Sequence, residues 1–273
     1  MHPKIGIIGA GNMSKAIVAG MMNSNKFDPN LIKISNRHFN KLEKVRESYR
    51  VRISTDNRKV ADFADVIVLA VKPKHITGVI EEIRDIIEEK NTLVISIAAG
   101  ITISYLCSHF NSQVKIIRTM PNTPAIVQEA MTAISYNGNV VEDDLNIVQE
   151  IFHSFGRTEI IPEELMDVVT AVSGSSPAIV YMFIEALADG AVLKGLPRDA
   201  AYRMVSQSIL GAAKLVRDSE MHPGQLKDNV TSSGGTAIEA LYTLEKKGFR
   251  GIVMESIEKC TEKSDIILKR YNK

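Results

Sequence analysis

Residues 4–14 read KIGIIGAGNMS, an apolar run followed by the pattern Gly-x-Gly-x-x-Ser. Gly9 allows a tight turn after the run, and Gly11 allows a pyrophosphate to approach the helix that follows, whose free N–H groups favour an anion. The stretch therefore predicts a strand, a turn and a helix that bind a dinucleotide, with a plain turn as the alternative. The residues predicted to contact the cofactor here are Gly9, Ala10, Gly11, Asn12 and Met13.

Short apolar runs alternate with amphipathic stretches from Lys4 to about Ile161, which is typical of repeated βα units on a parallel sheet. The runs are continuously apolar, as expected where helices cover both faces. The predicted strands are Lys4–Gly9, Leu31–Ser35, Val51–Ser54, Asp65–Val71, Thr92–Ala98, Val114–Thr119 and Met131–Ser135, with Thr158–Ile161 as an eighth candidate.

After Pro162 the strand-like runs stop and long helical stretches begin. We predict an α/β fold, with a Rossmann-type doubly wound sheet in residues 1–161 and an all-helical dimerisation domain in residues 162–273. The predicted helices are Pro177–Lys194, Pro197–Asp218, Gly224–Asn229, Thr236–Lys247 and Gly251–Arg270.

The first of these helices, with Pro177 expected in its first turn, is apolar on nearly every face. A domain of roughly 110 residues has little interior in which to bury such a helix, so the pattern favours burial between two subunits. The alternative is the central helix of a monomeric bundle.

The 273-residue chain is nearly neutral, with 33 Lys and Arg against 32 Asp and Glu. This balance leaves no overall field for nucleic acid or an anionic membrane, so we expect neither partner. Only Cys107 and Cys260 occur, without ligand histidines nearby, so we expect no metal site and no disulfide framework. Without a signal-like N-terminus or an apolar run near 18 residues, we expect a cytoplasmic protein.

The end of the second predicted strand reads Ser35-Asn36-Arg37. An NAD-selective site commonly carries Asp or Glu there, which would repel a 2′-phosphate, whereas these three side chains can donate hydrogen bonds to one. The residues therefore favour NADP(H) and leave NAD(H) as a second cofactor. The alternative for Arg37 is a solvated loop residue.

Two further strand ends are expected to complete the cofactor crevice, because ligands of such sheets bind beyond the carboxyl ends of the strands. Asn57, after the third strand, can reach the adenosine side, whereas Lys72 also fits an exposed loop charge. The residues at the two strand ends are Ala70, Val71, Lys72 and Pro73, and Ala98, Ala99 and Gly100.

A Ser/Gly-rich turn lies between two helical stretches within residues 222–241, HPGQLKDNVTSSGGTAIEAL. Free N–H groups and hydroxyls converge there, which suits a small carboxylate, although a capping turn is the alternative. The six histidines lie at spacings unlike those of metal ligands, and we interpret His222, beside Pro223, as structural.

Together these segments resemble the pyrroline-5-carboxylate reductase family over the whole chain. Besides residues 9–13, 70–73, 98–100 and 222–241, the resemblance rests on Met120-Pro121-Asn122-Thr123-Pro124 and on residues 171–178, AVSGSSPA. It implies NAD(P)H-dependent reduction of Δ1-pyrroline-5-carboxylate to L-proline, the last step of proline biosynthesis. It also implies a homodimer, which in this family often assembles into a larger ring.

The resemblance also implies roles for individual residues. Asn229 would hold the cofactor together with the strand-end residues named above. The residues at the substrate pocket would be Glu220, Ser232, Gly234, Gly235, Thr236 and Ala237. We assign no residue as catalytic, because a protonated imine needs mainly orientation and exclusion of water.

The chain departs from the family pattern at three positions. Ser233 replaces a usual proline, Ala237 a usual pocket threonine, and Ser176 a usual glycine. The alternatives are a related imine or 2-hydroxyacid reductase and a non-catalytic NADP(H) sensor. A β-hydroxyacid dehydrogenase is disfavoured, because residues 177–193 lack the lysine expected on its inter-domain helix.

Overall fold

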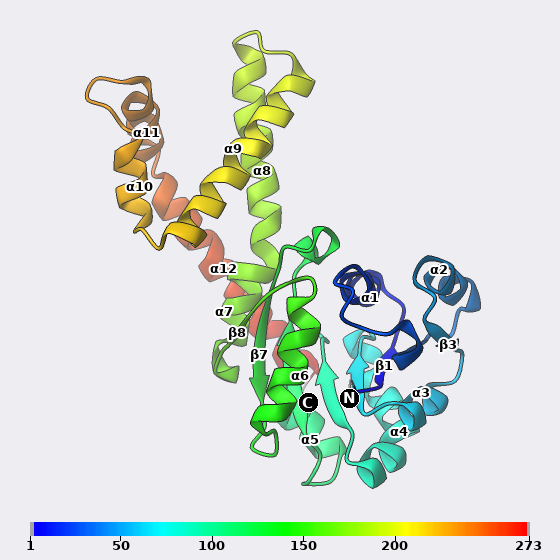
Figure 1. Ribbon diagram of the computed structural model, residues 1–273. Coiled ribbons are helices and arrows are strands. Elements are labelled where there is room, and N and C mark those ends of the chain that lie inside the picture. Colours follow the sequence, from blue (N-terminus) through cyan, green and yellow to red (C-terminus); the bar gives the residue numbers. More distant parts are fainter. Residues whose placement is uncertain (1–2, 272–273) are drawn as a thin grey trace. The chain divides into compact units, whose positions relative to one another are not determined.

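The computed structural model describes residues 3–271 of the chain. Their packing divides the protein into two compact units (Figure 1). The first comprises the chain through Ser175 together with the segment from Cys260 onward, and the second comprises residues Ser176–Lys259.

An eight-stranded sheet forms the first unit, with strand order β3-β2-β1-β4-β5-β6-β7-β8. The strands predicted from the sequence all form, with ends shifted by a few residues. Their bounds are β1 Ile5–Ile8, β2 Ile32–Ser35, β3 Arg52–Ser54, β4 Val66–Leu69, β5 Leu93–Ser96, β6 Ile116–Met120, β7 Ala130–Tyr136 and β8 Gly156–Ile160.

The last two strands depart from the expected parallel arrangement. β7 pairs antiparallel with β6, while β8 pairs parallel with β7. The link from β6 to β7 holds only a short 3-10 segment, Thr123–Val127, and a link of that length cannot make the crossover that parallel pairing requires. Helix α6, Glu142–His153, does provide such a crossover from β7 to β8.

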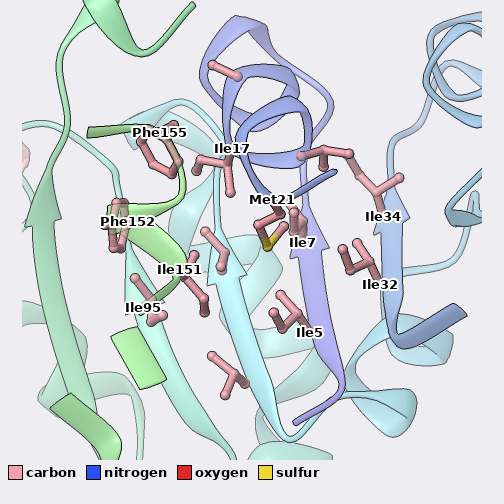
Figure 2. Packing of buried hydrophobic residues seen from close by; sticks show 14 of the residues in the cluster. Ile5, Ile7, Ile17, Met21, Ile32, Ile34, Ile95, Ile151, Phe152 and Phe155 are labelled. Carbon is pink, nitrogen blue, oxygen red and sulfur yellow. The ribbon is translucent and has the colours of Figure 1, made fainter. Parts of the chain in front are cut away.

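Helices cover both faces of the sheet, which confirms the doubly wound fold. On one face, α1, α2 and α6 bury a core that includes Ile7, Ile17 and Phe152, and Figure 2 shows Met21 of α1 beside Ile7. On the other face, α3, α4 and α5 form the second core. The new helices are α1 Asn12–Asn23, α2 Phe39–Tyr49, α3 Asn57–Phe63, α4 Ile76–Lys90 and α5 Ile103–His109.

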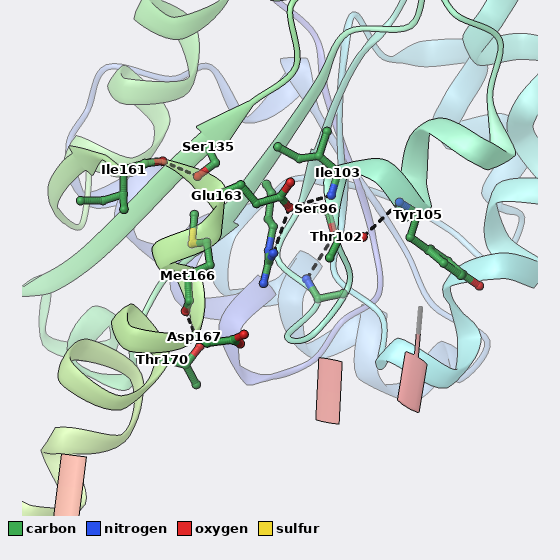
Figure 3. A network of polar contacts seen from close by, with 12 residues as sticks. Ser96, Thr102, Ile103, Tyr105, Ser135, Ile161, Glu163, Met166, Asp167 and Thr170 are labelled. Atoms are coloured by element: carbon green, nitrogen blue, oxygen red, sulfur yellow. Dashed lines mark hydrogen bonds and ion pairs between the residues drawn. The ribbon is translucent and has the colours of Figure 1, made fainter. Parts of the chain in front are cut away.

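The first unit extends beyond the domain boundary predicted at 161/162. The Glu163 carboxylate accepts hydrogen bonds from the backbone N–H of Ile103 at 2.7 Å and from Arg118 at 2.9 Å (Figure 3). Arg118 is only 5% exposed, so this charge pair is anchored in the sheet. Because Met166 and Ala171 are also buried, the packing of the first unit continues to Ser175.

The C-terminal part of helix α12, Phe249–Tyr271, also belongs to the first unit. Ser264 donates a hydrogen bond to the Asp167 carboxylate at 2.7 Å, and Tyr271 packs against the second core. The packing thus assigns to the first unit a segment that the predicted boundary placed in the helical domain.

The structure corrects the placement of Pro177. It does not open a helix, because α7, Met166–Val169, leads through a π-helical turn, Thr170–Ser175, directly into α8, Ser176–Leu193. In a regular α-helix the N–H of residue 177 would bond the carbonyl of Ser173, and proline has no N–H. The Asn122 side chain donates to that carbonyl at 3.1 Å instead, which satisfies the group that proline leaves unpaired.

The second unit consists of helices, as predicted. Within it, α8 buries only Ala188, and large apolar side chains such as Met182 and Leu187 are exposed by 66% and 43%. The other helices are α9 Arg198–Ser219, α10 Pro223–Asn229 and α11 Thr236–Lys246, followed by the start of α12. Apart from Ala188, only Ala201 is buried in these helices, among the residues described.

Residues Glu163–Leu193 form one continuous helical stretch that, by length and composition, is apolar enough to cross a membrane. A helix of this kind is also found as the core of a subunit interface. The sequence analysis found only short apolar runs and therefore predicted that no segment is long enough to span a bilayer. The length and composition of residues Glu163–Leu193 do not support that prediction.

Candidate active site

The turn between β1 and α1 forms one wall of a cleft. Gly9 has φ +110°, and its N–H donates to the Ser35 carbonyl at 2.9 Å. A Cβ added at Gly9 would lie 2.5 Å from the Ala70 carbonyl oxygen, whereas one at Gly11 would meet nothing within 4 Å. Gly11 is the N-cap of α1 and supplies no side-chain cap, so the start of this helix remains open to an anion.

The cleft has a volume of about 580 Å³ and lies beyond the carboxyl ends of β1, β2 and β4. The structure brings together nine of the predicted cofactor residues in its lining: Gly9, Ala10, Gly11, Asn36, Arg37, Asn57, Ala70, Val71 and Lys72. Eight further lining residues were not predicted from the sequence: Ile8, His38, Lys41, Lys74, His75, Gly78, Val79 and Glu82.

The cleft lining carries more positive than negative charge. Its cations are Arg37, Lys41, Lys72 and Lys74, and its one carboxylate is Glu82. Such a lining suits a ligand with several phosphate charges. Partial burial lowers the pKa of His75, and the positive charges around it lower that pKa further, with Arg37 the largest of these.

A chain of hydrogen bonds orients Asn57 in the wall of the cleft. The Ser35 hydroxyl donates to Asn57 Oδ1 at 2.7 Å, and Asn57 Nδ2 donates to Glu82 Oε2 at 2.8 Å. Ser35 is fully buried, so its hydroxyl faces Asn57 rather than the cleft in which we expected it to contact a phosphate. Its position indicates that Ser35 orients Asn57.

Next to these hydrogen bonds, Arg58 links the N-terminus of α3 to α4. Arg58 makes a bidentate ion pair with Asp85 at 2.8 and 2.7 Å, and it also donates to the Glu82 carbonyl at 2.7 Å. The hydrogen bonds from Arg58 lower the pKa of Asp85. Because both side chains are about half exposed, the pair fixes geometry more than it adds stability.

Eight predicted cofactor residues do not line the cleft: Asn12, Met13, Ser35, Pro73, Ala98, Ala99, Gly100 and Asn229. Asn12 and Met13 form the first turn of α1, directly after Gly11. Ala98 is buried, and Gly100 has φ +75° with Ile267 of α12 close to the place a Cβ would take. The loop after β5 is therefore held by packing against the C-terminal helix.

The predicted substrate segment lies in the second unit. Glu220 follows α9 with φ +56°, and Asn229 is the last residue of α10. His222 caps α10, because its Nδ1 accepts the N–H of Gly224 at 3.0 Å, which confirms a structural role.

The turn from Ser232 to Gly235 closes with a hydrogen bond from the Gly235 N–H to the Ser232 carbonyl at 3.0 Å. Gly234 has φ +67°, and Gly235 is the N-cap of α11 without a side-chain cap. Thr236 and Ala237 are the first two residues of the helix. The start of α11 therefore presents free N–H groups, as the sequence predicted.

A doubly wound sheet with a basic cleft at the carboxyl ends of its strands, followed by a helical unit, defines a dinucleotide-dependent oxidoreductase of the two-domain type. Two family models match the chain. "NADP oxidoreductase coenzyme F420-dependent" covers residues 4–100, and "Pyrroline-5-carboxylate reductase dimerisation" covers residues 163–266.

Similar proteins extend this result to the full chain. The pyrroline-5-carboxylate reductase of Escherichia coli is 45% identical over 98% of this chain and 100% of its own length. The structure of a pyrroline-5-carboxylate reductase from Coxiella burnetii has a TM-score of 0.94 at 35% identity and covers 98% of this chain and 99% of that one. The pyrroline carboxylate reductase of Plasmodium falciparum, solved with NADP bound, has a TM-score of 0.86 at 35% identity, with 97% and 98% covered. The chain belongs to the pyrroline-5-carboxylate reductase family.

Proposed function

We propose that this protein reduces Δ1-pyrroline-5-carboxylate to L-proline, the last step of proline biosynthesis, with NADPH as the preferred reductant and NADH as a second one. The observation that carries the proposal is the 45% identity to the E. coli reductase over both full lengths. The cleft fits the cofactor, because Gly11 leaves open space at the uncapped start of α1 and cations surround the ribose end.

The cofactor residues would act in four groups. The α1 start binds the pyrophosphate, Asn36 and Arg37 bind the ribose 2′-phosphate, and Asn57 contacts the adenosine. Residues 70–73 and 98–100 would hold the nicotinamide half. When bound, the reduced nicotinamide supplies the hydride that the imine carbon accepts.

The helical unit would bind the substrate. Free N–H groups at the start of α11, between Gly235 and Ala237, together with the Ser232 hydroxyl, hold the substrate carboxylate. Glu220 completes the pocket. The protonated imine is already electrophilic, so these residues act by orientation and by excluding water, and the imine proton comes from solvent or a nearby hydroxyl.

The assembly we propose is a homodimer, which can build a larger ring, in the cytoplasm and without a membrane or nucleic acid as partner. The first unit would bind the cofactor, and the helical unit would dimerise and bind the substrate. The dimerisation family model over residues 163–266 supports this use of the exposed α8 face.

The test is NADPH oxidation by the purified protein in the presence of Δ1-pyrroline-5-carboxylate, with proline identified as the product. We expect turnover with both cofactors and a higher kcat/KM with NADPH. Calorimetry that detects NADPH binding without turnover under any substrate condition would instead indicate a cofactor sensor.

Arg37→Ala is expected to raise the KM for NADPH by about 10- to 100-fold while changing the KM for NADH less than about threefold, because only NADPH carries the phosphate that Arg37 contacts. Steady-state kinetics with each cofactor measures the difference. Equal effects on the two cofactors would remove Arg37 from the 2′-phosphate site.

Ala237→Thr is expected to raise kcat/KM for pyrroline-5-carboxylate by about fivefold, because one added hydroxyl contributes about 1 kcal/mol beside a carboxylate. Residue 237 lies in the first turn of α11, where an anion is favoured. The matched control is an imine that lacks the carboxylate, for which we expect no gain. A gain of equal size with that imine would contradict the carboxylate placement.

A further inference from the structure

His75 lines the cofactor cleft at a position for which the sequence motifs predict no role. It ends a 3-10 turn, Pro73–His75, and is the residue immediately before α4. Its side chain does not cap that helix, although it occupies the N-cap position. The imidazole therefore lies at the cleft, next to the first residue of a 15-residue helix, and makes no capping hydrogen bond to that helix.

Charged groups from several elements line the cleft together with His75. Arg37 follows β2, Lys41 lies on α2, and Lys72 and Lys74 flank Pro73. Glu82, on α4, is the carboxylate of this lining, and it already accepts a hydrogen bond from Asn57. His38 is the second imidazole of the cleft.

This environment is unfavourable for a charged imidazole in the free protein. Partial burial lowers the pKa of His75, and three nearby cations, of which Arg37 has the largest effect, lower it further. The free protein therefore holds His75 mainly neutral at pH 7. A doubly charged anion placed between these cations would reverse the local potential and favour the imidazolium.

We propose that His75 is a specificity-determining residue that binds the ribose 2′-phosphate of NADP(H) opposite Arg37 and takes up a proton from solvent when that phosphate binds. The inference rests on the proposed use of NADP(H). The adjacent start of α4 adds its dipole to the attraction for the phosphate.

A pH dependence follows from the direction of the shift. Because the pKa of His75 is low in the free protein and higher in the complex, NADPH binding is strengthened at low pH, and the gain disappears as pH rises through the pKa of the complex. NADH lacks the phosphate, so its affinity does not change in this way. A range of pH 6.5–8.5 keeps the phosphate mostly dianionic, since its second pKa is about 6.

The experiment is isothermal titration calorimetry of the full-length protein with NADPH and with NADH at pH 6.5, 7.5 and 8.5. We compare the wild type with His75→Gln, which keeps a hydrogen-bond donor but does not titrate in this range. The control is His153→Gln, which replaces a histidine at the end of α6 that contacts Thr158 outside the cleft. Repeating the titrations in buffers of different ionisation enthalpy measures proton uptake directly.

For the wild type and His153→Gln, we expect NADPH affinity to rise about fivefold from pH 8.5 to pH 6.5, with proton uptake on binding. For His75→Gln, the rise should fall below about twofold and the proton uptake should diminish, while NADH affinity stays unchanged in all three proteins. Because proton uptake is also measured in the wild type, the test does not depend on the variant alone.

Equal weakening of NADPH and NADH by His75→Gln would overturn the inference, because it would place the imidazole on the adenine that both cofactors share. Wild-type NADPH binding without proton uptake would overturn it as well, while leaving the proposed function intact. Wild-type protein that binds neither cofactor would refute the proposed function and, with it, this inference.

Discussion

Gly9→Ala is expected to abolish measurable NADPH binding and to lower the melting temperature. The new Cβ would lie 2.5 Å from the Ala70 carbonyl oxygen and 2.9 Å from its carbon, and these are backbone atoms that cannot move without displacing the end of β4. A φ of +110° is also strained for an L residue, and such strain alone costs about 1–3 kcal/mol. NADPH affinity should fall by about 100-fold or more, because the same turn positions the start of α1.

Two alanine variants separate binding from stability. Gly11→Ala has free space around its Cβ, so we expect an unchanged melting temperature and weakened NADPH binding, because the added methyl enters the cleft. Gly138→Ala, in a loop with free space, should change neither. Thermal unfolding and NADPH fluorescence titration measure both quantities, and Gly9→Ala with wild-type NADPH affinity would contradict the turn's role.

The strands could be predicted because their runs are apolar on both faces. Val68 packs in one core and Ile67 in the other, as a sheet covered on both sides requires. The direction of β7 could not be predicted in this way, because apolar content does not reveal strand direction. The short link after β6 was the available signal, since it leaves no room for a crossover helix.

Pro177 shows where a local rule was insufficient. Proline near a Ser pair favours a helix start when only neighbouring residues are considered. In the structure the carbonyl that proline leaves without a donor is bonded by Asn122, a residue 51 positions earlier than Ser173. The same side chain also accepts the N–H of Met131 through its Oδ1 at 2.9 Å. Tertiary contacts of this kind cannot be deduced from the local sequence.

The residues of the cofactor cleft could be predicted where a sequence motif indicates a backbone conformation that requires glycine, as at Gly9. They could not be predicted where the contribution depends on the packing of α4 beside β4, as for His75 and Glu82. Ser35 illustrates the same limit, because its type and position fit a phosphate donor, yet burial directs its hydroxyl to Asn57.

Leu187→Glu is expected to produce insoluble protein or an inactive monomer. Leu187 lies on α8, which buries only Ala188 within the chain, and the dimerisation family model covers this helix. The exposed apolar side chains of α8 would be removed from water if a second copy of the chain covered this helix. A carboxylate there would be buried without a partner on dimerisation, at a cost of several kcal/mol.

The matched control is Tyr136→Glu, which introduces the same charge at the end of β7 in the first unit. Tyr136 and Leu187 are exposed to similar extents in the single chain, 41% and 43%, so the single chain alone predicts similar tolerance. We expect Tyr136→Glu to remain dimeric and active, whereas Leu187→Glu is expected to lose at least about 100-fold in kcat/KM, because loss of the dimer would also destabilise the folded chain. Sedimentation equilibrium and NADPH oxidation measure the two outcomes. A wild-type protein that sediments as a fully active monomer would refute the dimer, and an active, dimeric Leu187→Glu would show that this face of α8 lies outside the interface.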